Sequence, residues 1–217
     1  MTAQATTTND LFGCRSVSGF SRFTEVARFS QGSLLNYTAI GRELGVDRKT
    51  VESYFDILDD LLIGYRITPF QKRAKRSLVA SSKFYYFDVG VYKSLRPSGP
   101  FDRPEEAAGV AIETLVLQHL IAYNAYYDAG FDIHFWRTKE GQEVDFVVYG
   151  QKGLYAFEIK HASRITRGDC KALNLFKGDY DIAQCMMIYG GSLKEYHGDI
   201  SVLPWQDALD YIESIMQ

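Results

Sequence analysis

The stretch EVDFVVYGQKGLYAFEIK, residues 143–160, carries the pattern that decides the fold of this 217-residue chain. Two apolar-rich runs flank the turn residues Gly150–Gly153, and this spacing predicts a β-hairpin. The first run contains the carboxylate Asp145, the second contains Glu158, and Lys160 follows two residues later. If the two strands pair across the turn, these three charged side chains converge on one side of the hairpin.

The elements around the hairpin predict a mixed α/β domain. A helix of about six turns begins at Glu105, and its apolar residues recur at helical spacing. We then expect strands at 131–137, 143–149 and 154–160, a helix at 169–176, a strand at 184–189, a short strand at 200–203 and a last helix at 205–216. The order is therefore α-β-β-β-α-β, followed by one more strand and one more helix.

The first 95 residues predict a different architecture, a winged helix-turn-helix. Apolar residues at helical spacing predict helices over 20–30, 37–44 and 48 to about 62. Asn36 and Asp47 are suited to cap the second and third helices, and Gly45 to end the second one. A short helix, a glycine turn and a longer helix form the helix-turn-helix pattern.

Basic residues lie at two places in this region that could meet nucleic acid. Arg48 and Lys49 open the third helix, near the end that would enter a major groove. A basic loop contains Lys72, Arg73, Lys75 and Arg76, and it lies between two strand-like runs, 63–67 and 83–88. Two strands around a basic loop fit the wing of a winged helix, and the loop has the higher charge density for phosphate contacts. The other interpretation is a domain of the same shape that binds protein or acts as a spacer.

The charge distribution and the prolines divide the chain. Residues 1–100 hold 14 Lys and Arg against 9 Asp and Glu, whereas residues 101–217 hold 10 against 18. The stretch 96–104 contains three of the five prolines and is the best candidate for a linker. We therefore predict a flexible N-terminal segment (1–19), a winged-helix-like domain (20–95) and an α/β domain (105–217).

Several classes of protein are excluded by composition. No apolar run is long enough for a transmembrane helix, and the N-terminus lacks the pattern of a signal peptide. The three cysteines are widely spaced, which suits a reducing cytoplasm rather than a disulfide framework or a metal cluster. No P-loop motif occurs in the sequence. We expect a cytoplasmic protein without a membrane partner.

The charged residues of the hairpin suggest a metal site. Two close carboxylates repel each other unless a cation lies between them, and Mg²⁺ prefers one or two carboxylates together with water and phosphate oxygens. A neighbouring lysine such as Lys160 can orient a water molecule and offset charge on a phosphate. Glu113, placed in the apolar helix segment GVAIETLVL, is the candidate for a third carboxylate ligand.

The spacing Asp145…Glu158-Ile159-Lys160, preceded by a helical Glu113 in an α-β-β-β-α-β order, resembles the PD-(D/E)XK nuclease superfamily, which has the restriction-endonuclease fold. Val144 stands where that superfamily often has a proline. The resemblance implies that Asp145 and Glu158 are ligands of Mg²⁺ or Mn²⁺, that Lys160 is the catalytic lysine, and that Glu113 is an additional metal ligand.

A narrower resemblance covers about residues 20–176. The segments LNYTAIGRELGVDRKTVESYFDILDDLLI, SSKFYYFDVG, FWRTKEGQEVDFVV and AFEIK are similar, in this order, to the C-terminal half of a prokaryotic ATPase family. Its members join an AAA+-type P-loop domain to a winged helix and a nuclease-like domain of unassigned function. The resemblance implies that this sequence is either a fragment that begins after the ATPase domain or a protein that has lost it.

Two functions from different classes follow. The first is a DNA nuclease that depends on Mg²⁺ or Mn²⁺ and uses the winged helix to present DNA. The second is a non-catalytic module of an AAA+-type ATPase that binds DNA or a protein partner.

Overall fold

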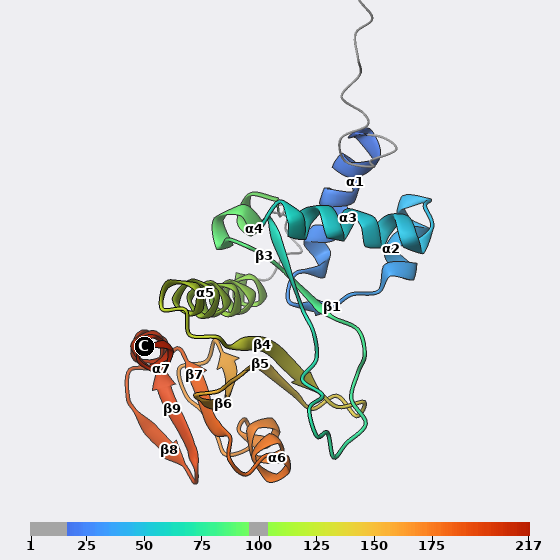
Figure 1. Cartoon of the computed structure of the whole chain (residues 1–217). Coiled ribbons are helices and arrows are strands. Elements are labelled where there is room, and N and C mark those ends of the chain that lie inside the picture. Colours follow the sequence, from blue (N-terminus) through green and yellow to red (C-terminus); the bar gives the residue numbers. More distant parts are fainter. Residues whose placement is uncertain (1–16, 96–103) are drawn as a thin grey trace, which may run out of the picture. The chain divides into compact units, whose positions relative to one another are not determined.

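The computed structural model describes residues 17–95 and 104–217, which form two compact units (Figure 1). The described part of the N-terminal unit comprises residues 17–66 and 84–95, and that of the C-terminal unit comprises residues 67–83 and 104–217. The mixed α/β architecture expected from the sequence is matched in its coarser features. Both units mix helices with a sheet, and no helix among the described residues is long and apolar enough to cross a membrane.

The N-terminal unit consists of helices around a small three-stranded sheet. Its elements are α1 (Val17–Ala27), η2 (Arg28–Ser30), β1 (Ser33–Leu34), α2 (Tyr37–Leu44), α3 (Arg48–Asp60), β2 (Gly64–Ile67), β3 (Lys83–Tyr86) and α4 (Val89–Leu95). The strands lie in the order β1-β3-β2. Phe55 from α3 contacts the rings of Phe23 and Phe84 edge-on, with centroids 4.9 and 5.0 Å away, and all three rings are fully buried.

The helix ends follow the predicted capping residues. The Asn36 side chain accepts a hydrogen bond from the Ala39 N–H at 3.0 Å, and Asp47 accepts one from the Thr50 N–H at 2.9 Å. Gly45 adopts the left-handed conformation, with φ of 71°, which allows the sharp turn between α2 and α3. The sequence prediction of two helices joined at this turn is confirmed.

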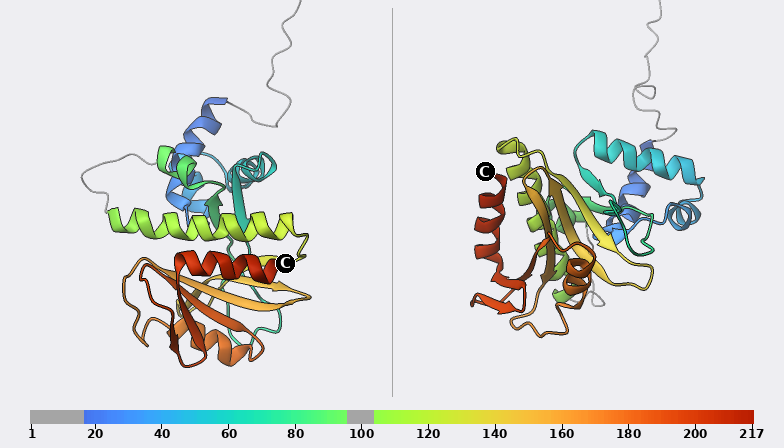
Figure 2. Two further views of the ribbon diagram at one scale, coloured as in Figure 1. Left: turned by 90° about the vertical axis from the view of Figure 1, so that its left-hand side faces the viewer. Right: turned by 60° about the horizontal axis from the view of Figure 1, so that its bottom comes forward.

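The C-terminal unit is a six-stranded mixed sheet with helices on both faces. Its elements are α5 (Pro104–Tyr126), β4 (Asp132–Arg137), β5 (Glu143–Gly150), β6 (Gly153–Lys160), α6 (Lys171–Asp179), β7 (Gln184–Tyr189), β8 (Glu195–His197), β9 (Ile200–Pro204) and α7 (Trp205–Met216). The strand order is β4-β5-β6-β7-β9-β8, with β4, β5 and β6 antiparallel and β6, β7 and β9 parallel. The two views of Figure 2 show α5 and α7 along one face and α6 on the other.

The predicted order of elements is confirmed, and the structure adds the short strand β8. The hairpin β5–β6 turns at Gln151-Lys152, with Gly150 paired to Gly153 as its last rung. Val147 and Ala156 of the hairpin and Leu173 and Phe176 of α6 belong to one buried apolar cluster. This packing holds the hairpin that carries the predicted site.

The basic loop between β2 and β3 packs as part of the C-terminal unit, not as the free tip of a wing. Phe70 is only 2% exposed and lies against the rings of Phe176 and Tyr180. The Phe70 N–H donates to the Phe135 carbonyl at 2.7 Å, which ties the loop to β4. The free energy gained by burying the Phe70 ring in this core outweighs the conformational entropy that an exposed loop would retain.

Candidate functional site

The hairpin brings Asp145 and Glu158 to the same end of β5 and β6. Phe146 pairs with Phe157, and the next residues along the two strands are Asp145 and Glu158. Asp145 is 7% exposed, and its Oδ2 accepts a hydrogen bond from the Ile159 N–H at 2.8 Å. The two acids are close enough that the negative charge of Asp145 raises the pKa of Glu158.

A buried lysine that sequence analysis did not single out lies in this acidic cluster. Lys83, at the start of β3, is 2% exposed. Its ammonium forms an ion pair with Glu143 and lies 3.7 Å from Oδ1 of Asp145. Burial lowers the pKa of Lys83, but the negative charges of Asp145, Glu143 and Glu113 outweigh it and raise the pKa above its usual value. Lys83 therefore stays protonated and neutralises part of the cluster.

The cluster still holds more carboxylates than cations can neutralise. Burial raises the pKa of Asp145, against the opposing effects of Lys83 and of the hydrogen bond from Ile159. Burial and the charge of Asp145 together raise the pKa of Glu158 to about 10. The Oε2 atom of Glu158 is buried and has no hydrogen-bond partner in the part of the chain that the structure describes. Such an orphaned oxygen is costly unless it is protonated or meets a cation.

Lys160, at the end of β6, is held by a neighbour that sequence analysis also missed. Its Nζ donates to Oδ1 of Asp169 at 2.8 Å, and this bond raises the pKa of Lys160. The other Asp169 oxygen accepts from the backbone N–H and the hydroxyl of Thr166, at 2.8 and 2.7 Å. These bonds hold the pKa of Asp169 well below its usual range. Lys160 is thus a fixed cation, about one-third exposed, and the charges of Glu158 and Asp145 act on it.

The role of Glu113 as a third metal ligand stays a prediction. Over residues 17–95 and 104–217, no three His, Cys, Asp or Glu side chains are grouped so that they could hold a metal ion. Glu113 lies on α5 and contributes to the negative potential at Lys83. The buried ammonium of Lys83 thus lies within electrostatic reach of three carboxylates, those of Glu113, Glu143 and Asp145.

The four cations of the basic loop are mostly engaged within the C-terminal unit. Arg76 donates to the buried Asp179 at 2.7 Å, and Lys75 reaches the Gly178 carbonyl at 3.5 Å. Lys72 lies 3.6 Å from Asp132, with its ammonium 4.0 Å from the centre of the Tyr149 ring. Arg73, with a positive φ of 52°, lines a cavity of about 650 Å³ together with Lys72, Lys75, Phe70, Tyr149, Leu154, Asp179, Tyr180, Asp181 and Ile182.

At the start of α3, the predicted groove-facing cations are exposed. Arg48 forms a 2.8 Å ion pair with Glu52, one turn along the helix, and its guanidinium lies 5.9 Å from the centre of the Tyr37 ring. Lys49 is exposed next to it. Lys49 is therefore freer than Arg48 to meet a phosphate.

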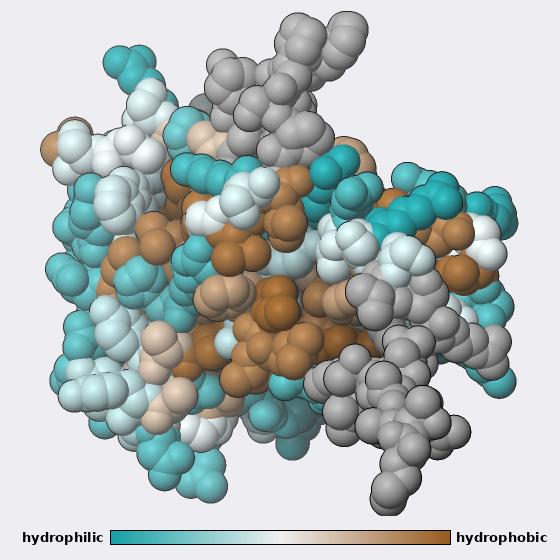
Figure 3. Space-filling model, turned by 90° about the horizontal axis from the view of Figure 1, so that it is seen from above, coloured by the Kyte–Doolittle hydropathy of each residue, from teal (hydrophilic) through white to brown (hydrophobic). Residues whose placement is uncertain are grey.

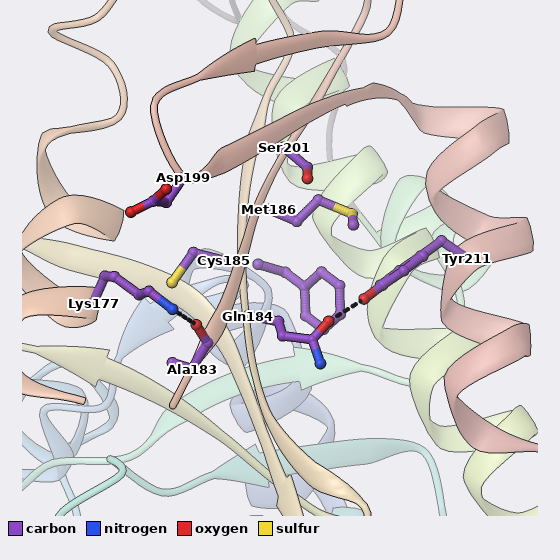
Figure 4. A pocket seen from close by; sticks show the side chains of 9 residues that line it. Lys177, Ala183, Gln184, Cys185, Met186, Asp199, Ser201 and Tyr211 are labelled. Carbon is purple, nitrogen blue, oxygen red and sulfur yellow. Dashed lines mark hydrogen bonds between the residues drawn. The ribbon is translucent and has the colours of Figure 1, made fainter. Parts of the chain in front are cut away.

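A second, smaller cavity lies where β7 begins (Figure 4). Its volume is about 170 Å³, and several of its polar side chains bond to the protein itself. Lys177 donates to the carbonyls of Asp181 and Ala183, and Tyr211 donates to Gln184 at 2.9 Å. Burial raises the pKa of the Cys185 thiol in its wall to about 12, so that this sulfur is not a thiolate nucleophile.

The surface seen in Figure 3 mixes hydrophilic and apolar residues. The large apolar side chains that are exposed include Phe29, Leu62, Tyr126 and Ile182. Apolar atoms contribute much of any folded surface, so these residues alone mark no binding site.

Comparison with known proteins gives relatives without an assigned activity. Residues 108–208 match a family described as a domain of unknown function (DUF4143), and residues 8–102 match another domain of unknown function (DUF8612). The chain is 28% identical over 164 residues to the uncharacterized protein Rv2008c of Mycobacterium tuberculosis and to the uncharacterized protein Mb2031c of Mycobacterium bovis. The aligned region covers 74% of this chain and 35% of each relative, so the chain spans about a third of their length.

Proposed function

We propose that the C-terminal unit is a nuclease-like domain of the PD-(D/E)XK type that hydrolyses phosphodiester bonds of DNA with Mg²⁺ or Mn²⁺. The N-terminal unit would act as a winged helix that binds the DNA. One observation carries the proposal: Asp145, Glu158 and Lys160 lie within electrostatic reach of one another, and a buried oxygen of Glu158 has no hydrogen-bond partner among the described residues.

The donor set fits a divalent ion that is shared with substrate. Mg²⁺ is commonly bound through one or two carboxylates, with water and phosphate oxygens as the remaining ligands. Glu158 offers Oε2, which has no hydrogen-bond partner among the described residues, and Asp145 offers Oδ1, which the Lys83 ammonium approaches at 3.7 Å. A third carboxylate is not required for such a site, so it does not depend on a three-residue cluster, of which the described part of the chain holds none.

In this mechanism, Asp145 and Glu158 would hold the ion. Mg²⁺ would supply charge that polarises a phosphate oxygen and lowers the pKa of a bound water. Lys160 is bonded to Asp169 and protonated, so its role is electrostatic: its ammonium stabilises the negative charge that develops on the phosphate. Asp169 positions Lys160 for this role.

Lys160→Met tests this proposal. We expect Mn²⁺-dependent nicking of supercoiled plasmid to fall by about 10²-fold or more, because a fixed cation near the phosphate is lost. Lys171→Met is the matched control, since Lys171 is an exposed lysine at the start of α6. If the wild-type protein cuts single- and double-stranded DNA no faster than Lys160→Met with either metal, the nuclease proposal is rejected.

A non-catalytic module of a larger ATPase is the alternative, and one observation favours it. Lys83 already neutralises part of the acidic cluster without a metal. The relatives are about three times as long as the aligned region, which leaves room in them for a further domain such as an AAA+-type ATPase. DNA binding without cleavage by the wild-type protein would support this alternative.

Lys49→Gln tests DNA binding by the N-terminal unit. Loss of one phosphate contact is expected to weaken binding similarly for all sequences and to reduce the slope of log K against log salt by about 1. Fluorescence anisotropy with a labelled duplex at several salt concentrations measures both quantities. Lys93→Gln, on α4, is the control. An unchanged salt slope would remove Lys49 from the interface.

A further inference from the structure

We propose that Lys83 is a built-in cation of the acidic site, and that its ammonium and a divalent metal ion bind there in mutually exclusive fashion. The inference rests on the proposed function, because it concerns the same Asp145–Glu158 pair. It adds a regulation of that site: the arrangement with Lys83 inserted is the metal-free, resting form.

The position of Lys83 is unusual for a lysine and requires the acids around it. Lysine is almost never fully buried unless it is paired. Lys83 is 2% exposed, forms an ion pair with Glu143 and lies 3.7 Å from Asp145. The aromatic ring of Phe135, 5.6 Å from the ammonium to the ring centre, covers it from another direction. Attraction to these carboxylates therefore holds the Lys83 side chain in its buried position.

Exclusion follows from the geometry at Asp145. Oδ2 already accepts a hydrogen bond from the Ile159 N–H, so Oδ1 is the freer oxygen for a cation. Oδ1 faces the Lys83 ammonium at 3.7 Å, whereas a bound Mg²⁺ would need to approach that oxygen to about 2.0–2.1 Å. Two cations that share one carboxylate oxygen in a buried site repel strongly. The metal can enter only when the ammonium leaves, and the ammonium is stable there only when the metal is absent.

The Lys83 ammonium and a divalent metal ion would have the same role in the cluster, because each would neutralise carboxylates. Glu143 has a second cationic partner, because Arg137 donates to it at 2.5 Å. Glu143 therefore remains paired when Lys83 withdraws. Asp145 and Glu158 also feel the charge of Lys160, but this lysine is about one-third exposed and is already bonded to Asp169. A divalent ion would compensate both acids at once.

Isothermal titration of the full chain with Mn²⁺, comparing the wild type with Lys83→Met, tests the inference. We expect Lys83→Met to bind Mn²⁺ at least about 10-fold more tightly, because no internal cation competes for the carboxylates. Without metal, Lys83→Met should unfold at a lower temperature than the wild type. Mn²⁺ should raise its midpoint by more than it raises that of the wild type. Lys171→Met should behave as the wild type does in both measurements.

The outcomes separate this inference from the proposed function. If the wild type and Lys83→Met bind Mn²⁺ with equal affinity, the exclusion is wrong while the metal site stands. If neither protein binds Mn²⁺, the metal site itself is rejected, and the exclusion with it. If Lys83→Met does not fold without metal, Mn²⁺ in the refolding buffer should restore folding of this variant and of Lys83→Gln. Failure to restore either variant would overturn the inference.

Discussion

Replacing Glu158 with glutamine is expected to stabilise the metal-free protein at neutral and alkaline pH. Burial and the charge of Asp145 raise the pKa of Glu158 from 4.5 to about 10. Between these two values the folded protein binds more protons than the unfolded chain, so the free energy of unfolding decreases as pH rises. Glutamine has no proton to lose and removes this dependence. We expect a gain of about 1–3 kcal/mol at pH 8 that disappears below pH 4.5.

The same substitution is expected to remove activity. A neutral amide is a much weaker ligand for Mg²⁺ than a carboxylate, so cleavage should fall by about 10³-fold if the proposed site is correct. Urea unfolding in the presence of a chelator at pH 4.5 and pH 8, together with a plasmid nicking assay, measures the two effects. Glu140→Gln, at an exposed position, is the control. A variant with the pH dependence of the wild type would show that Glu158 is not a buried acid.

Phe70→Ala is expected to reduce the free energy of unfolding by about 3–5 kcal/mol. The ring is 2% exposed and packs against Tyr149, Phe176 and Tyr180, so its removal leaves a cavity in the core of the C-terminal unit. Denaturant unfolding measures the loss. Ile182→Ala, at a residue 72% exposed in the same unit, should cost less than about 1 kcal/mol.

Equal effects of the two substitutions would contradict the structure at this loop. The basic loop would then be a free wing, and its cations would be available to DNA. The predicted large effect of Phe70→Ala instead follows from the backbone bond to Phe135 and from the ring packing on α6.

Local signals predicted most of the secondary structure. Asn36, Gly45 and Asp47 act at the ends of α2 and α3 through bonds that involve only nearby residues. The β5–β6 hairpin was also predictable, because its two-residue turn and its apolar runs are local features. The strand β8 was missed, since its three residues, Glu195–His197, carry no apolar alternation and pair only because β9 lies beside them.

The candidate site was predictable only where its residues share one hairpin. Asp145, Glu158 and Lys160 are close in sequence, and the strand register brings them together. Lys83 is 62 positions before Asp145, in a run of aromatic residues whose pattern indicates only a strand. Asp169 resembles any loop acid until its bond to Lys160 is seen. No one-dimensional pattern marks a buried cation such as Lys83 that comes from a distant strand.

The assignment of residues 67–83 to the C-terminal unit has a consequence for cutting the chain into fragments. A fragment that begins at Glu105 would contain all six strands of the large sheet but neither Phe70 nor Lys83. Its core would have an open gap beside Phe176, and its acids would lack their internal partner. In the complementary fragment that ends at Leu95, Phe70 of the basic loop would lack the core of the C-terminal unit in which it is normally buried. A single cut in the chain therefore does not separate the two units. Lack of activity in a C-terminal fragment would say nothing about the activity of the intact protein.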